Sequence, residues 1–114
     1  MKRIKNEELE DITKVAAYIR NCDIPLPTQR RIITKWANKY GIDVKFYKEI
    51  EGFERSYEIY NQMIRDAEGE SFDCIVAYNK DILFDDDLQL KECQYQLCDV
   101  PVIILVFKPF LGKL

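Results

Sequence analysis

The 114-residue sequence contains no histidine, and this absence removes several classes of active site. Without an imidazole, the chain has no Ser–His or Cys–His nucleophile pair and no histidine ligand for a metal ion. Four glycines are present, but none forms a GxGxxG or GxxxxGK[ST] phosphate-binding loop. We therefore expect neither a metal nor an organic cofactor.

Paired cysteines and long hydrophobic runs are also missing. The four cysteines form no CxxC pair. The longest apolar run, 100–107, contains a proline and is too short to span a membrane. No apolar stretch follows the basic residues at the N-terminus, so no signal peptide is visible. These features predict a cytoplasmic protein with reduced thiols and no membrane partner.

The remaining composition is that of one small globular domain. Hydrophobic residues make up 47% and charged residues 32%, which is too apolar for a disordered chain. A net charge of −3 argues against a strongly basic nucleic-acid binder. The charge is uneven, because a basic stretch at 28–48 precedes an acidic stretch at 81–99. Two solvated helix faces are the simpler interpretation of this pattern, and a dipolar surface is the alternative.

Apolar residues alternate between strand and helix periodicities along the chain. This order, with short connections, predicts a three-layer, Rossmann-like α/β domain: a mostly parallel sheet of four to five strands with helices on both faces. Residues 1–13 are expected to form a polar extension, and 14–114 the domain. Strands are predicted at 15–19, 43–47, 72–78 and 100–107, and the helical stripes between them at 32–40, 60–67 and 90–97.

Two of these helices are preceded by polar residues that suit a helix start. Ser56 precedes the second helical stripe and is predicted to be its N-cap. Asp85, Asp86 and Asp87 precede the third stripe, where carboxylates complement the helix dipole. This structural role is a better explanation of the acidic triplet than a metal site.

The carboxyl ends of the predicted strands are the expected place for a site, as in other open parallel sheets. They are followed by the loops at 20–22, 49–55 and 79–81. In the first loop Arg20 lies two residues before Cys22, and a neighbouring guanidinium favours the nucleophilic thiolate. A phosphatase loop of the C-x5-R type is excluded, because Thr28 stands where the arginine is required.

The segment 15–22, VAAYIRNC, resembles the Tyr-x-Arg-x-Ser opening of the serine recombinases, the resolvase and invertase group. Gln29 lies where that family commonly has a glutamine, and 79–85 lies at its Asp-Arg-Leu-x-Arg motif. No motif is intact, so the resemblance depends on order and spacing over about 14–107. It implies the resolvase-like fold of the family's N-terminal catalytic domain.

In that family a serine hydroxyl attacks a DNA phosphodiester, arginines hold the phosphate, and a tetramer exchanges strands. By position, Cys22 stands where the nucleophilic serine is expected. Arg55 lies two residues before the position of an arginine that precedes the family's second helix. The candidate catalytic residues implied by the resemblance are Cys22, Arg20, Asp81, Gln29 and Arg55.

The chain departs from the family at the residues that bind phosphate. Ile82 and Asp85 stand where the later motif has two arginines. Losing one preorganised donor typically costs ~10²–10³ in rate, so two losses and an added carboxylate predict activity near or below detection. Only 108–114 follow the last predicted strand, where the family continues into a long helix and a DNA-binding domain. The resemblance thus implies a degenerate and truncated domain.

Three functions remain open, and whether the chain is an enzyme depends on which holds. The first is an inactive recombinase-like domain, acting as an interaction or regulatory module or surviving as a mobile-element remnant, with a protein partner or as a homo-oligomer. The second is an active recombinase that uses Cys22 beside a DNA-binding partner. The third is an unrelated small α/β binding domain, which a non-central first strand would favour. DNA is implied by the resemblance alone, and its binding is expected to be weak.

Overall fold

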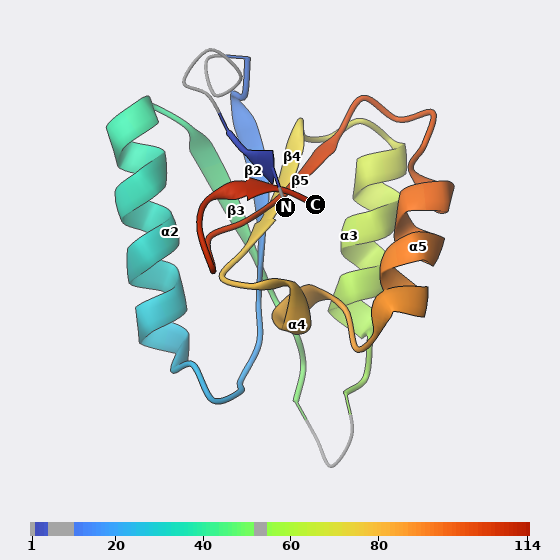
Figure 1. The fold of residues 1–114 in the computed structure, drawn as a ribbon, viewed down its shortest axis with the longest axis horizontal. Coiled ribbons are helices and arrows are strands. Elements are labelled where there is room, and N and C mark those ends of the chain that lie inside the picture. Colours follow the sequence, from blue (N-terminus) through green and yellow to red (C-terminus); the bar gives the residue numbers. More distant parts are fainter. Residues whose placement is uncertain (1, 5–10, 52–54) are drawn as a thin grey trace.

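The computed structural model describes residues 2–4, 11–51 and 55–114, and it has three layers (Figure 1). A β-sheet lies in the middle, with α2 on one face and α3 and α5 on the other, which confirms the predicted fold class. Most of the polar extension predicted at 1–13 lies outside the described residues. The elements are β1 (Lys2–Arg3), β2 (Lys14–Ile19), α2 (Leu26–Tyr40), β3 (Asp43–Lys48), α3 (Glu58–Glu68), β4 (Cys74–Ala77), α4 (Lys80–Leu83), α5 (Asp87–Gln96), β5 (Ile103–Val106) and β6 (Gly112–Lys113).

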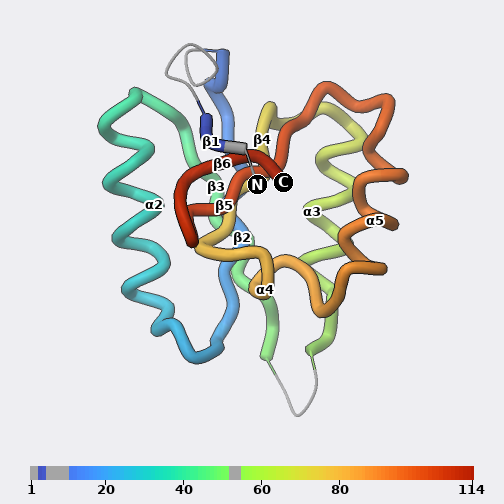
Figure 2. Tube along the Cα trace, viewed as in Figure 1, coloured from blue at the N-terminus to red at the C-terminus, as the bar shows by residue number. Residues whose placement is uncertain are grey.

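The sheet has the order β1-β6-β5-β4-β2-β3. The four strands β5, β4, β2 and β3 are parallel, and the two-residue strands β6 and β1 extend the β5 edge in antiparallel fashion. Figure 2 shows these first and last strands side by side. The chain passes from β2 to β3 and then returns across β2 to β4. The interior position of β2 creates a topological switch point between β2 and β4, where α/β sheets bind ligands.

Strand β2 is apolar throughout because both of its faces are buried. Ala16 and Tyr18 face the helices α3 and α5, whereas Val15, Ala17 and Ile19 face α2. The edge strand β3 alternates between exposed and more buried residues instead, as its polar and apolar alternation predicted.

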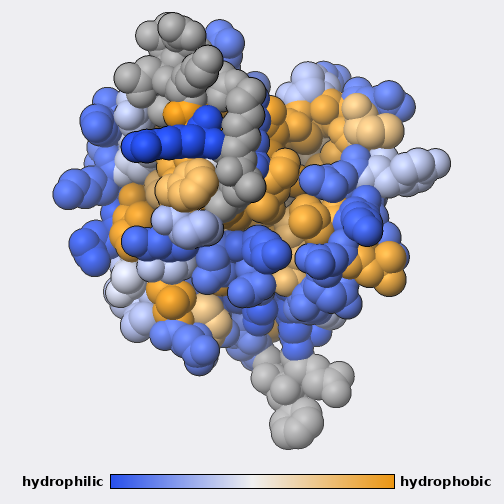
Figure 3. All heavy atoms as spheres, viewed as in Figure 1, coloured by the Kyte–Doolittle hydropathy of each residue, from blue (hydrophilic) through white to orange (hydrophobic). Residues whose placement is uncertain are grey.

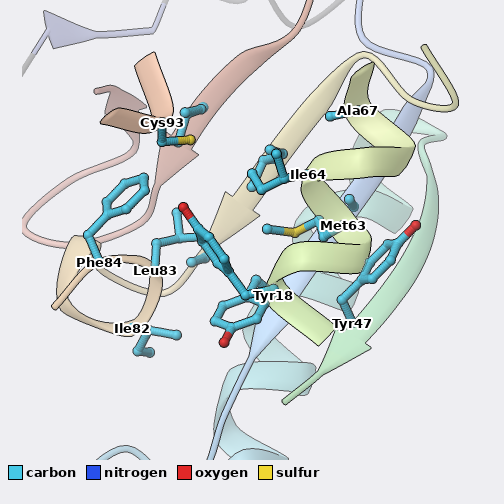
Figure 4. Close-up of a cluster of buried hydrophobic side chains, with 14 of the residues drawn as sticks. Tyr18, Tyr47, Met63, Ile64, Ala67, Ile82, Leu83, Phe84 and Cys93 are labelled. Carbon is cyan, nitrogen blue, oxygen red and sulfur yellow. The ribbon is translucent and has the colours of Figure 1, made fainter. Parts of the chain in front are cut away.

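The helices bury most of the stripes that the sequence predicted, but Tyr40, in the stripe at 32–40, is exposed. Ile33 and Trp36 of α2 pack against the sheet, and the Trp36 ring meets Phe107 edge-on with 5.5 Å between ring centroids. On the other face Met63 and Ile64 of α3 point toward the strands (Figure 4). None of the helices in the described ranges combines the length and apolarity needed to cross a membrane.

The helix starts differ in part from the prediction. Ser56 is not the N-cap of α3. The N-cap is Tyr57, whose backbone lies in the left-handed region at φ 61°. The Ser56 hydroxyl instead accepts a hydrogen bond from the Glu58 N–H at 3.3 Å. At α5 the acidic triplet lies at the helix start as predicted, and the Asp86 carboxylate also caps the helix by accepting from the Gln89 N–H at 2.8 Å. The short helix α4 was not predicted from the sequence.

Candidate functional site

The candidate site lies at the carboxyl edge of the sheet, at the switch point between β2 and β4. Arg20 directly follows β2 and reaches across to the segment after β4. Its Nε donates to the Ile82 carbonyl at 2.9 Å, and its Nη2 donates to the Asp81 carbonyl at 3.0 Å. The first predicted arginine therefore binds backbone of its own chain.

Arg55 reaches the same edge from the segment that precedes α3, and its side chain is only 7% exposed. Its Nε and Nη2 donate to the Tyr18 hydroxyl at 3.2 and 2.9 Å, and Nη2 also donates to the Leu83 carbonyl at 2.9 Å. The guanidinium also lies over the rings of Tyr18, Tyr57 and Tyr60, 4.5 to 5.3 Å from their centroids. Acceptors of the protein itself thus surround this cation.

Asp85 places a carboxylate between the two arginines. Its Oδ1 accepts a hydrogen bond from Arg55 Nη1 at 2.8 Å and lies 4.0 Å from Arg20 Nη2. This residue stands where the resemblance implies an arginine. An anion that engaged both guanidiniums would have to compete with the Asp85 carboxylate.

Gln29 and Cys22 meet at the loop that follows Arg20. The fully buried Gln29 side chain donates through Nε2 to the carbonyls of Arg20 and Ile24, at 2.9 and 2.7 Å. The same nitrogen lies 3.6 Å from the exposed Cys22 Sγ. Gln29 thereby holds the loop between β2 and α2 in place, through the Arg20 and Ile24 carbonyls and the Cys22 sulfur.

Asp81 does not join the other predicted residues through its side chain. The residue is exposed, and within the described ranges its carboxylate forms no hydrogen bond or ion pair. Its backbone carbonyl takes part instead, as the acceptor from Arg20. The structure therefore links the predicted residues in two groups: Gln29 contacts the Arg20 backbone and the Cys22 sulfur, and the Arg20 and Arg55 side chains both lie beside the Asp85 carboxylate.

Glu49 is a buried carboxylate that the sequence reasoning missed. It is 1% exposed and connects the end of β3 to the start of α3. Its Oε1 accepts from the Tyr18 hydroxyl at 2.6 Å and from the Tyr60 N–H at 3.0 Å. Its Oε2 accepts from the N–H groups of Ile59 and Ile50 at 2.9 and 3.2 Å, and from the Ser56 hydroxyl at 3.2 Å.

These contacts shift the ionisation of both partners. Burial alone would raise the pKa of Glu49, but the hydrogen bonds from Tyr18, Ile59, Tyr60 and Ser56 outweigh burial and lower that pKa below its ordinary value. Burial, together with the neighbouring Glu49 carboxylate, raises the pKa of Tyr18. The network therefore consists of a charged Glu49, a neutral Tyr18 and a charged Arg55. The one feature of the sequence that pointed to this network was the position of Tyr18 in the recombinase-like opening.

Comparison with known proteins identifies the fold of this chain. No protein-family profile matches the sequence, and no curated protein sequence matches it. Solved structures do match. The N-terminal catalytic domain of TP901-1 integrase is 23% identical, with a TM-score of 0.64 over 82% of this chain and 77% of that one. The C-terminal catalytic domain of ISC1926 TnpA, an IS607-like serine recombinase, is 22% identical, with a TM-score of 0.66 over 83% of this chain and 70% of that one. The chain has the fold of the serine recombinase catalytic domain, as the sequence resemblance implied.

Proposed function

We propose that this chain is a recombinase-fold domain that does not cleave DNA and that acts as an interaction or regulatory module. The observation that carries this proposal is the Asp85 carboxylate, 2.8 Å from Arg55 and 4.0 Å from Arg20. It supplies negative charge where strand cleavage would require positive charge.

The chemistry of strand cleavage explains why this carboxylate matters. Attack by the Cys22 thiolate would form an S–P bond to the DNA 5′ phosphate and release the 3′ oxygen, which takes a proton. Negative charge develops on the phosphoryl oxygens during this displacement and must be stabilised by positioned donors. Arg20 and Arg55 direct their donors at protein oxygens instead, and Asp85 would repel the phosphate.

An interaction role fits a domain that keeps its fold without a competent phosphate site. Two of its structural neighbours are catalytic domains of an integrase and of a serine recombinase. Recombination or integration is therefore the process in which such a module would act, bound to a protein partner or to a second copy of this chain. DNA contact in this setting would position the module rather than lead to cleavage.

A covalent-capture experiment tests the absence of cleavage. Because the DNA site is unknown, the substrate is a pool of nicked duplexes of randomised sequence, which traps any cleaved intermediate. After incubation with the purified chain, a denaturing gel should show no protein–DNA adduct. An adduct that disappears in the Cys22→Ala variant would establish the active alternative and overturn the proposal.

A phosphate titration tests the electrostatic reason separately. Asp85→Asn removes the carboxylate from the arginines, and Asp87→Asn removes an equal charge two residues away, where Asp87 faces Lys80 at 3.7 Å. Inorganic phosphate, followed through the arginine Nε–H NMR signals, should bind Asp85→Asn at least tenfold more tightly than it binds the wild type. Equal affinities for the wild type and both variants would contradict the role given to Asp85.

A further inference from the structure

The outer side of α2 carries a second cationic surface, formed by Arg30, Arg31, Lys35 and Lys39, and called here the α2 basic face. All four residues are exposed. Within the described part of the chain none of them forms an ion pair, because every ion pair there involves other cations. Unlike the arginines of the candidate site, these four have no ion-pair partner among the carboxylates that the structure describes.

The α2 basic face has a regular geometry. Arg31, Lys35 and Lys39 are four residues apart, so they lie in a row with about 6 Å of helix rise between neighbours. Arg30 lies over the Phe46 ring at 4.7 Å, which orients its guanidinium. A shallow trough, wide open to solvent, lies on this face and is lined by Pro27, Arg30, Arg31, Thr34, Lys35 and Asn38.

The cations of the basic stretch at 28–48 do not all lie on the same side of the sheet. Lys45 belongs to that stretch, but its ammonium lies 5.0 Å from the centroid of the Tyr47 ring, which packs in the cluster on the opposite side of the sheet from α2. The acidic stretch runs along α4, α5 and the segments beside them, and α5 lies across the sheet from α2. Figure 3 shows hydrophilic side chains projecting from the α2 flank, at the left of the view. Four of the 17 arginines and lysines thus form a local basic surface on a chain whose net charge is −3.

We infer that the α2 basic face binds the phosphate backbone of nucleic acid. Arginine, lysine, threonine and asparagine side chains are the usual donors to backbone phosphates, and all four types line the trough. A row of such donors contacts successive phosphates without reading bases, so binding is independent of sequence. This surface is separate from Asp85 and Cys22, so its binding is tested independently of the cleavage experiment.

Fluorescence anisotropy with a labelled 25-base-pair duplex of arbitrary sequence tests this inference at 50 to 200 mM NaCl. Four phosphate contacts predict a slope of about −3.6 for log affinity against log salt, a loss of ~10² in affinity over this range. The double variant Arg31→Gln with Lys35→Gln should bind at least tenfold more weakly at 50 mM and lower the steepness of that slope by about 2.

The matched control is the double variant Lys91→Gln with Lys108→Gln, which loses the same charge at exposed positions outside α2. It should keep the wild-type slope and affinity, and circular dichroism should show both double variants folded. Three results would overturn the inference. The first is no binding by the wild type at 50 mM, and the second is an equal loss in both double variants. The third is salt-sensitive self-association in sedimentation that only the α2 variant loses while its DNA affinity stays unchanged, which would identify an acidic protein surface as the occupant.

Discussion

Replacement of Glu49 by glutamine should destabilise the domain far more than an ordinary charge removal. The carboxylate accepts hydrogen bonds through both of its oxygens, and among the donors are the N–H groups of Ile59 and Tyr60 at the start of α3. Glutamine keeps the shape of the side chain but replaces one accepting oxygen with a donating NH₂. In either orientation of the amide, a backbone N–H group of α3 then faces a donor.

The magnitude follows from the contacts that each orientation loses. With the NH₂ at the Oε2 position, the Ile59 and Ile50 N–H groups lose their acceptor. With the NH₂ at the Oε1 position, the Tyr60 N–H loses its acceptor, and the Tyr18 hydroxyl has to turn away. Hydrogen bonds to a charged group contribute about 1.5–3 kcal/mol each, so we expect a loss of about 3 kcal/mol in the free energy of unfolding.

Urea unfolding followed by circular dichroism measures this change directly. The matched control is Glu51→Gln, which removes an exposed carboxylate two residues away and should change the free energy of unfolding by less than about 0.5 kcal/mol. A loss below about 1 kcal/mol for Glu49→Gln would refute the view that this carboxylate organises the start of α3.

The pH dependence provides a second readout from the same pair of proteins. The pKa of Glu49 is lowered by folding, so its contribution is complete above the ordinary value of 4.5 and is lost as the pH falls through the folded-state pKa. The destabilisation of Glu49→Gln relative to the wild type should therefore shrink below about pH 4.5. The pKa values of Asp66 and Asp73 are also lowered, so the variant should keep part of the acid dependence.

Three further substitutions test the packing and the helix ends, each by urea unfolding. Met63→Ala, at a fully buried position of α3, should cost about 2–5 kcal/mol, and a cost below 1 kcal/mol would mean that this core is loosely packed. Asp86→Ala should cost about 1 kcal/mol through loss of the α5 N-cap, whereas Asp86→Asn should retain most of the stability. Gly41→Ala should cost about 1–2 kcal/mol because Gly41 has φ 63° and a Cβ there meets no atom within 4 Å, so the cost is conformational and Gly41→Asn should be milder.

The fold could be predicted because its main elements carry strong local patterns. The continuous apolar run of β2 reflects burial on both faces, and the stripe through Met63 reflects the single buried face of α3. The helix α4 has four residues, too few for any periodicity to appear. The N-cap prediction at Ser56 was wrong because the N–H groups at the start of α3 bind Glu49, a residue several positions earlier, and no local pattern reports this contact.

The position of the candidate site could be predicted from the sequence, but the groups that bind its two arginines could not. Parallel strands place their following loops at one edge, so the proximity of Arg20 to the segment after β4 followed from the expected fold. Asp85 could be recognised as a replaced arginine, but its contact with Arg55 required the structure. The acceptors for Arg20 are backbone carbonyls, and a backbone carbonyl has no signature in the sequence.

The two cationic surfaces of this chain differ in what their cations already bind. At the carboxyl edge an incoming phosphate would have to displace the Asp85 carboxylate from Arg55, a contact with a largely buried guanidinium. On α2 the side chains of Arg31 and Lys35 are exposed and form no ion pairs with other described residues, so binding of a phosphate would displace only water and counter-ions. The same residue types are therefore structural at one surface and available for binding at the other. This difference, rather than the number of cations, is the physical reason to expect nucleic acid along α2 and not at the site that the fold resemblance indicates.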